Sequence, residues 1–296
     1  MPARISSLRV LRGLCGELPR RRSGWWKTAL IAAIAALNFF PIYWIIVTSV
    51  SPVSEILSRD LLSLLPTRPT FGAYGSLFSF MPYATYLANS LVVGFATTGL
   101  TLAVSALGGY ALARLSFPGR NLIGRMVLFT YTVPSVLLLI PLYTAMVRYG
   151  IQNTRFSLVL AHATFAIPFT LWLLRGFFHS LPAELEDAAM IDGASHFTTL
   201  CKIVLPLAAP GLVTAAIFGF ILSWNEYLFA LVFINDDAIR TIPVGVAANI
   251  MTGNIQPGHW PILMAASIVS SVPVGALFLF LQKSLVQGLT AGGVKA

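Results

Sequence analysis

The stretch Leu181–Pro206, which reads LPAELEDAAMIDGASHFTTLCKIVLP, is where an otherwise apolar chain gathers acidic residues. Four of the ten acidic residues in the whole sequence fall within it, namely Glu184, Glu186, Asp187 and Asp192. A helix is expected to begin at Pro182, because proline suits the first turn and carboxylates complement the positive N-terminal end of the helix dipole. The stretch therefore predicts a short polar helix within an apolar sequence.

This first helix is expected to run for about ten residues, with Leu185, Ala188 and Ala189 on its apolar face. Gly193 is expected to end it, because glycine readily takes the left-handed conformation that follows many helices. Ser195 can then cap a second helix, because its side-chain oxygen would accept a hydrogen bond from a backbone N–H group of that helix. The stretch therefore predicts a helix–glycine–helix bracket.

The bracket resembles the signature of the membrane-spanning permeases of ABC-type import systems. That signature is E-A-A, three residues, G, nine residues and I-x-L-P, and the matching residues here are Asp187-Ala188-Ala189, Gly193, Ile203 and Leu205-Pro206. Asp187 stands where the family has glutamate, with Glu186 directly before it, so either carboxylate could take that role. The residues to which the resemblance assigns coupling to a separate ATPase are Glu184, Glu186, Asp187, Ala188, Ala189, Asp192 and Gly193. The alternative is a solvated amphipathic loop helix that contacts no partner.

The composition is that of a protein with several membrane spans. Of the 296 residues, 57% are hydrophobic and only 10% are charged, with a mean hydropathy of +0.81, whereas about a quarter of the residues of a soluble domain are charged. Stretches long enough to span a bilayer are expected at residues 28–50, 86–113, 122–146, 156–178, 204–234 and 260–281. The two cysteines, Cys15 and Cys201, predict no disulfide framework.

The expected fold is an all-α integral membrane protein with six transmembrane helices, which the resemblance makes a type I ABC importer permease with a cytoplasmic coupling-helix bracket. The expected segments are a basic cytoplasmic tail (1–27), a first transmembrane helix (28–50), an extracytoplasmic loop (51–85), a core with five further transmembrane helices and the bracket (86–283, bracket 181–206), and a cytoplasmic tail (284–296). The basic tail either lies on the anionic inner leaflet or is disordered, and both interpretations stay open.

The basic residues predict the orientation of the chain. With the N-terminus inside, 14 of the 19 Lys and Arg residues lie on the cytoplasmic side and five on the other side. This is the bias of the positive-inside rule. We therefore expect the chain in the cytoplasmic (inner) membrane, with both termini and the acidic bracket on the cytoplasmic side. The formal net charge of +9 is therefore explained by basic residues at the inner face of the membrane, where they contact lipid, and does not indicate a nucleic-acid partner.

Sequence motifs for catalysis are absent. There is no G-x-x-x-x-G-K-[ST] for ATP, no H-E-x-x-H, no C-x-x-C and no G-x-S-x-G, and the four histidines are scattered. We therefore expect no catalytic residue, no metal site and no cofactor bound by this chain. ATP and Mg²⁺ would belong to a partner ATPase, and the chain itself would not be an enzyme.

Glu226 is the only acidic residue within an expected span, in the run Trp224-Asn225-Glu226-Tyr227. A charge at the bilayer centre costs about 3 kcal/mol, so Glu226 should face the bundle interior, a partner or water. These four residues are candidates for lining a substrate pathway; the alternative is that Glu226 is a structural anchor near the outer interface. For Asn38, Asn89 and His162, hydrogen bonding between helices is the favoured role.

Three further stretches resemble the sugar branch of the permease family, and particularly its maltose-type second permease subunit. They are LPTRPTFGAY (65–74), SWNEYLFAL (223–231) and QKSLVQGLTAGGVKA (282–296). The resemblance implies import of an oligosaccharide, monosaccharide, polyol or glycerol phosphate, with a homologous second permease, an ABC ATPase dimer and an extracytoplasmic solute-binding protein as partners. The loop at 235–259, rich in Gly, Pro and Asn, would face that binding protein. The alternatives are import of a non-sugar solute by the same architecture and an ion-coupled secondary carrier.

Overall fold

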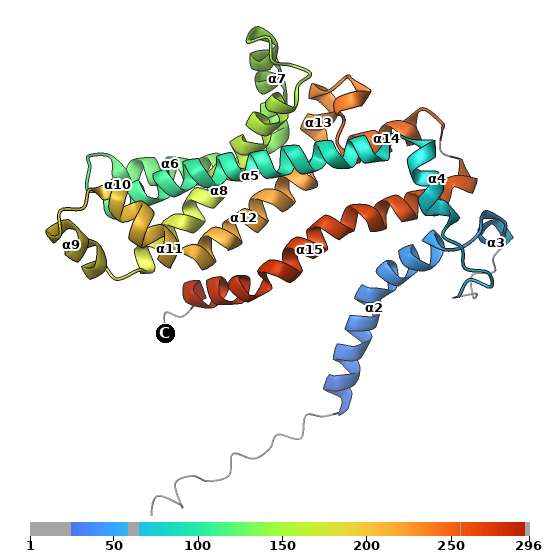
Figure 1. Ribbon diagram of the computed structural model, residues 1–296, viewed down its shortest axis with the longest axis horizontal. Helices are drawn as coiled ribbons and strands as arrows, with labels where there is room; N and C mark the ends of the chain where they lie inside the picture. The colour runs from blue at the N-terminus through green and yellow to red at the C-terminus, as the bar shows by residue number, and fades with distance from the viewer. Residues whose placement is uncertain (1–24, 59–64, 255, 294–296) are drawn as a thin grey trace, which may run out of the picture. The chain divides into compact units, whose positions relative to one another are not determined.

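The computed structural model describes residues 25–58, 65–254 and 256–293, and it is built from helices (Figure 1). The α-helices are α2 (Trp25–Ser49), α3 (Val53–Ser58), α4 (Gly72–Phe80), α5 (Tyr83–Arg114), α6 (Arg120–Tyr131), α7 (Leu139–Arg148), α8 (Arg155–Ser180), α9 (Glu184–Ile191), α10 (His196–Thr199), α11 (Leu205–Leu207), α12 (Ala209–Trp224), α13 (Leu228–Phe233), α14 (Ile242–Met251) and α15 (Trp260–Gly293). Between them lie the 3-10 turns η1 (Ser135–Leu138), η3 (Asp237–Ile239) and η4 (Pro257–His259) and the π-helical segment η2 (Leu200–Val204). The fold class expected from the sequence, all-α, is confirmed.

The chain divides into two units, residues 1–46 and 47–296, and each is described by itself. In the first unit the described part begins with α2, which is long and apolar enough to cross a membrane. This helix covers the first predicted span. The predicted basic tail at 1–27 lies almost entirely outside the described residues, so its two interpretations stay open.

Within the described residues, four helices are long and apolar enough to cross a membrane: α2, α5, α8 and the part of α15 up to Gln282. Two further apolar segments are bent. The pair Arg120–Tyr131 and Ser135–Arg148 turns by 98° at the break before Ser135, and the pair His196–Leu207 and Ala209–Trp224 turns by 81°. The six predicted spans are therefore reached only if each bent pair counts as one span.

The prediction of one helix over residues 204–234 is wrong. Its first residues belong to the bracket, α12 covers only 16 residues, and the chain then breaks at 225–227 before the short helix α13. The predicted loop at 235–259 also differs, because its centre forms the ten-residue helix α14. In the other direction, α15 continues as a helix to Gly293, through most of the predicted C-terminal tail.

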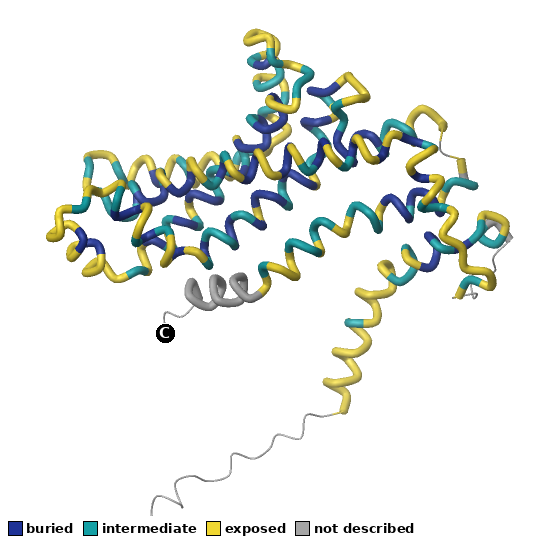
Figure 2. Tube along the Cα trace, viewed as in Figure 1, coloured by how far each residue is buried: buried dark blue, intermediate teal, exposed yellow. Residues whose placement is uncertain are grey.

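Three long helices of the second unit, α5, α8 and α12, pack against one another (Figure 1). Small residues allow the close approach of α5 and α8: a Cβ added to Gly109 would lie 3.2 Å from the backbone nitrogen of Arg175. Small residues at such contacts are typical of membrane helices, because close backbones gain van der Waals contact where water supplies no hydrophobic driving force. Buried positions run along these three helices (Figure 2).

The buried apolar side chains of the described residues form three clusters along the second unit. One lies near the bracket and includes Tyr110, Phe178 and Val204. A second joins α8 to α13 and includes Leu158, Phe229 and Phe233. The third, at the end that carries α14, consists of Leu77, Met81, Tyr83, Tyr86, Phe220, Trp224, Ile242, Ile262 and Ala266. The bundle is thus packed at both ends, and the polar features described next are built onto these clusters.

Candidate functional site

The bracket forms as the sequence predicts, at the end of the second unit opposite α14 (Figure 1). Gly193 has a φ of 84°, the left-handed conformation that lets the chain leave α9. Ser195 caps α10, with its Oγ accepting the backbone N–H of Thr198 at 3.3 Å. The second arm then passes through the π-helical segment η2 before α11. A helix–glycine–helix bracket is therefore present, with α9 two residues shorter than the ten or so expected.

The face that α9 buries differs from the predicted one. Leu185 is 44% exposed and Ala188 is exposed, whereas the buried residues of the helix are Glu186 and Ala189. An acidic residue is buried here because it has partners. The Glu186 carboxylate lies 2.7 Å from Nε of Arg114 and accepts a hydrogen bond of 3.0 Å from the hydroxyl of Tyr110.

Arg114 also donates from Nη2 to the backbone carbonyl of Leu181, at 2.5 Å, so it holds the bracket at two points. The charges suit their helices, since Arg114 lies in the last turn of α5 and Glu186 in the first turn of α9. Glu186 therefore attaches the bracket to the bundle. The other acidic residues of the bracket, Glu184, Asp187 and Asp192, are exposed, together with Ala188 and Gly193.

Glu226 lies in the break between α12 and α13, and its carboxylate is held by three nitrogen atoms. Oε1 accepts the backbone N–H of Phe229 at 2.8 Å, and Oε2 accepts that of Ala230 at 3.1 Å and lies 3.1 Å from Nε2 of His162. Glu226 thus closes the N-terminal end of α13, where backbone N–H groups would otherwise be unpaired. The other ring nitrogen of His162, which is fully buried, lies 2.8 Å from Oγ of Ser223.

His162 on α8 therefore links two parts of the broken span, and the interhelical role expected for it is confirmed. Asn89 also bonds between elements, donating to the backbone carbonyls of Ala238 and Arg240. Asn38 donates to Ile34 four residues earlier in its own helix, and the interhelical role expected for it stays a prediction.

Two cavities lie beside the break at 225–227. The larger has a volume of about 590 Å³ and is lined by Thr130, Tyr131, Val133, Ser135, Leu138, Thr164, Phe165, Pro168, Leu222, Asn225, Glu226 and Phe229. The smaller, of about 340 Å³, is lined by Trp224, Asn225, Ile242, Pro243, Val246, Ala247, Ile250, Ala266, Ser267 and Ser270. Of the four pathway candidates, Asn225 borders both cavities, Glu226 the larger one and Trp224 the smaller one. Tyr227 borders neither and packs against the apolar cluster around α13.

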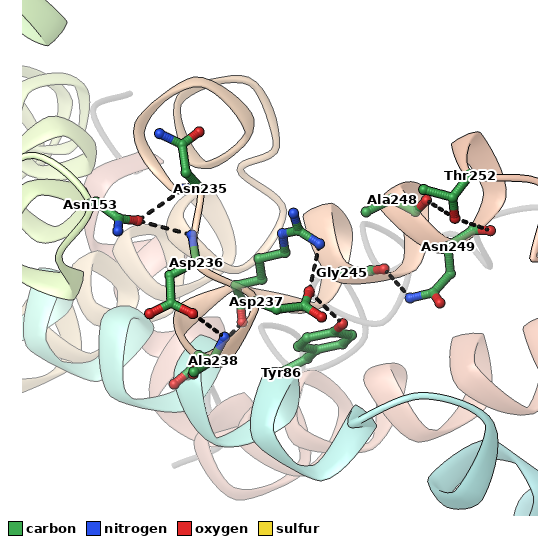
Figure 3. Close-up of polar contacts among 12 residues, drawn as sticks. Tyr86, Asn153, Asn235, Asp236, Asp237, Ala238, Gly245, Ala248, Asn249 and Thr252 are labelled. Atoms are coloured by element: carbon green, nitrogen blue, oxygen red, sulfur yellow. Dashed lines mark hydrogen bonds and ion pairs between the residues drawn. The ribbon is translucent and has the colours of Figure 1, made fainter.

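At the end opposite the bracket, a polar network holds residues 235–240 to the bundle (Figure 3). The side-chain oxygen of Asn153 accepts the backbone N–H groups of Asn235 and Asp236, at 2.9 and 3.1 Å. The hydroxyl of Tyr86 donates to Asp237 at 3.1 Å, and Arg240 donates to the same carboxylate oxygen. The segment that follows, α14, packs its Gly245 against the ring of Tyr86.

We call residues 235–252 the far segment. The sequence predicted a loop over 235–259, but hydrogen bonds from Tyr86 and Asn89 hold residues 237–240, and the helix α14 follows them. Among the described residues, no group of three His, Cys, Asp or Glu side chains is placed to hold a metal ion.

Several helices long and apolar enough to cross a membrane, an anchored polar bracket and broken helices beside cavities are the features of a polytopic transport protein. Residues 99–291 match the family described as "Binding-protein-dependent transport system inner membrane component", and the chain belongs to that family. The resemblance drawn from the bracket is thereby confirmed.

Relatives match over nearly the whole chain. The sulfoquinovosyl glycerol transport system permease protein SmoH of Agrobacterium fabrum is 39% identical, covering 90% of this chain and 92% of its own. The trehalose/maltose transport system permease protein MalG of Thermococcus litoralis is 37% identical, covering 90% and 94%. The trehalose transport system permease protein SugB of Mycobacterium tuberculosis is 36% identical, covering 93% and 98%.

Solved structures share the fold. A chain of a bacterial ABC transporter that imports the acidic polysaccharide alginate superposes with a TM-score of 0.76 at 24% identity, covering 96% of this chain and 100% of its own. A chain of the MetNI methionine ABC transporter in an inward-facing conformation gives 0.51 at 19% identity, covering 68% and 94%. The expected ABC importer permease fold is confirmed, with its spans bent as described above.

Proposed function

We propose that the chain is the transmembrane permease subunit of an ATP-driven, binding-protein-dependent importer for a sugar or a related polar solute. The family and the transport systems named for its relatives support the proposal. The chain would be a non-catalytic subunit. Its sequence holds no P-loop, so hydrolysis of ATP, with Mg²⁺, would take place in a separate ATPase dimer.

In this proposal the bracket lies in the cytoplasm with both chain termini, as the distribution of Lys and Arg favours. The exposed side of α9 presents Asp187 and Ala188 to a groove of the ATPase, where the small side chain of Ala188 permits close backbone approach. Glu184, Asp192 and Gly193 are exposed as well. Glu186 is buried against Arg114 and so cannot face the ATPase directly. The exposed Asp187 therefore fills the family's glutamate position at the interface.

A homologous second permease would complete the pathway, and a solute-binding protein would dock at the far segment. The ATPase dimer would close and open around ATP and move the bracket with it. Such a movement can change the pathway only if the bracket contacts the ATPase differently in its two states, since coupling is a difference in binding free energy. The ion pair between Glu186 and Arg114 supports this proposal most, because it joins the bracket to α5. This is the longest helix of which every side chain is described.

The test is recovery of partners from detergent-solubilised native membranes with the tagged chain. We expect an ABC ATPase, a second permease and a secreted binding protein with the wild type. Ala188→Trp should lose the ATPase and retain the second permease, because the bulky ring keeps the bracket out of its groove. Ala96→Trp, at an exposed position in the middle of α5, is the control for membrane insertion. Full recovery of the ATPase with Ala188→Trp would contradict the coupling role.

A further inference from the structure

Two of the helix breaks in the second unit, at 132–134 and at 225–227, meet at one cavity. The break between α6 and η1 contributes Val133 to the 590 Å³ cavity, and the break between α12 and α13 contributes Asn225 and Glu226. Between them, α8 contributes Pro168, the proline inside that helix. Transporters build solute sites near the membrane midplane from such discontinuous helices, because irregular backbone is tolerated there only where it lines a cavity or is buried in protein.

The lining combines ring faces with hydroxyl and amide groups. Tyr131, Phe165 and Phe229 supply aromatic rings, and Phe165 and Phe229 lie with their centroids 4.9 Å apart. The hydroxyl groups of Tyr131 and Ser135 make no hydrogen bond to any other described residue, so both are available to a ligand. The volume falls in the range of about 300–1,000 Å³ that is usual for small-molecule sites. Apolar faces with a few polar groups suit a sugar, which has apolar C–H faces and a rim of hydroxyls.

The charge of the lining restricts the solute further. Among the described residues, no lysine or arginine borders the cavity, and the one carboxylate that does is that of Glu226. An anion cannot use the N-terminal end of α13 either, because Glu226 already accepts the N–H groups of Phe229 and Ala230. A second negative charge beside Glu226 would be repelled by its carboxylate.

We infer that this chain itself contacts the transported solute in the 590 Å³ cavity, and that the cavity takes a neutral polyhydroxylated solute rather than an anionic one. The inference deepens the proposed function and rests on it for the presence of a transported solute. It excludes glycerol phosphate from the candidate solutes. It also sets this chain apart from the alginate transporter that shares its fold, whose substrate is an acidic polysaccharide.

The test places a cysteine in the cavity. Thr164→Cys is made in a chain whose two cysteines, Cys15 and Cys201, are replaced by serine. Thr164 is exposed and borders the cavity. The matched control is Ser267→Cys in the 340 Å³ cavity, whose lining, in the part of the chain that the structure describes, includes no ionisable side chain. Both are made in the full chain in permeabilised native membranes. Each reacts with two methanethiosulfonate reagents of similar size, one ending in a neutral hydroxyl and one in an anionic sulfonate.

The quantity compared is the ratio of the neutral reagent's rate to the anionic reagent's rate. At Thr164→Cys we expect this ratio to be about ten times its value for a free thiol in solution, because the nearby carboxylate repels the anionic reagent. At Ser267→Cys the ratio should stay close to that of the free thiol. Maltose and trehalose should slow the modification of Thr164→Cys if either is carried, and glycerol 3-phosphate should not.

Equal rates with the two reagents, or faster anionic modification, would overturn the inference about charge. No modification by either reagent would show that the partner permease fills the cavity, and would overturn the solute site altogether. Stronger slowing of the Thr164→Cys modification by glycerol 3-phosphate than by the neutral sugars would also overturn the inference. These rates need neither ATP nor a binding protein, so failure here is distinct from failure of the importer assignment, which the recovery of partners reports.

Discussion

Replacing Glu186 by alanine tests whether the bracket is held to the bundle by one buried carboxylate. The substitution removes the 2.7 Å ion pair with Arg114 and the 3.0 Å hydrogen bond from Tyr110. It leaves the guanidinium of Arg114 with the carbonyl of Leu181 as a partner. The bracket should then detach from the end of α5 for part of the time, while the helices of the bundle stay packed.

The size of the effect follows from the burial of the pair. Removing one partner of a buried ion pair costs about 3–5 kcal/mol, because the other charge is left without compensation. The side chains of Arg114 and Glu186 are 15% and 6% exposed, and Arg114 keeps one bond, so the lower value of about 3 kcal/mol applies. At about 1.4 kcal/mol per factor of ten, the ratio of attached to detached bracket should fall roughly 100-fold.

The measurement is the mobility of a spin label on the bracket. Ile191 is 87% exposed, so Ile191→Cys in a chain without Cys15 and Cys201 carries the label outside the packed contacts. Glu186→Ala should give a mobile component that the parent chain lacks. Asp187→Ala is the matched control, since Asp187 is exposed, and it should leave the label unchanged in the chain alone. In the assembled importer both variants should lose ATP-driven uptake.

Two results would refute this reasoning. One is an unchanged label spectrum in Glu186→Ala, which would mean that apolar contacts alone fix the bracket. The other is an equal gain in mobility from Asp187→Ala, which would mean that any loss of charge loosens α9. A charge-exchanged variant, Arg114→Glu with Glu186→Arg, should recover part of the immobile component if the pair itself is responsible.

Other positions give shorter tests. Gly193→Pro should abolish ATP-driven uptake with membrane insertion intact, because proline is fixed near a φ of about −65° and the elbow requires 84°; normal uptake would contradict the role of the elbow. Gly245→Ala should lower the thermal midpoint of the solubilised chain by a cost of about 1–3 kcal/mol, because its Cβ would lie 2.4 Å from the ring of Tyr86, whereas Gly75→Ala meets no atom within 4 Å and should not. His162→Ala should destabilise the chain by about 1 kcal/mol, because it removes one partner each from Ser223 and Glu226, which keep Thr97 and the backbone N–H groups of Phe229 and Ala230; an unchanged midpoint would mean that water replaces the ring.

Local signals predicted the bracket well, because its shape depends on residues close in sequence. Gly193 and Ser195 act within their own turns, and the structure has the left-handed elbow and the cap where the sequence placed them. The buried face of α9 could not be predicted in this way. Helical spacing put Leu185 inside, but the partners of Glu186 lie on α5, more than 70 residues earlier. A buried ion pair depends on tertiary contacts that periodicity does not contain.

The breaks were missed for a related reason. Residues 204–234 are mostly apolar, so hydropathy merges α12 and α13 into one span, although Glu226 within them marked an irregularity. The structure shows that Glu226 lies in the break after α12 and accepts backbone N–H groups in the first turn of α13. A single acidic residue in an apolar run is therefore better interpreted as a possible helix start than as an isolated charge. His162, its partner, could not be paired with it from sequence alone.

The contrast between intact and broken helices constrains how the proposed importer could change conformation. Helix α5 holds the far segment through Tyr86 and Asn89 and the bracket through Tyr110 and Arg114. Its 32 residues contain no proline and span about 48 Å at 1.5 Å per residue. A continuous helix bonded at both ends moves as one body, so displacement of the bracket must reach the far segment along it. The segments around 132–134 and 225–227 have no continuous helix to resist bending, and both border the same cavity. Changes in cavity shape should therefore concentrate at these breaks while α5 keeps its length.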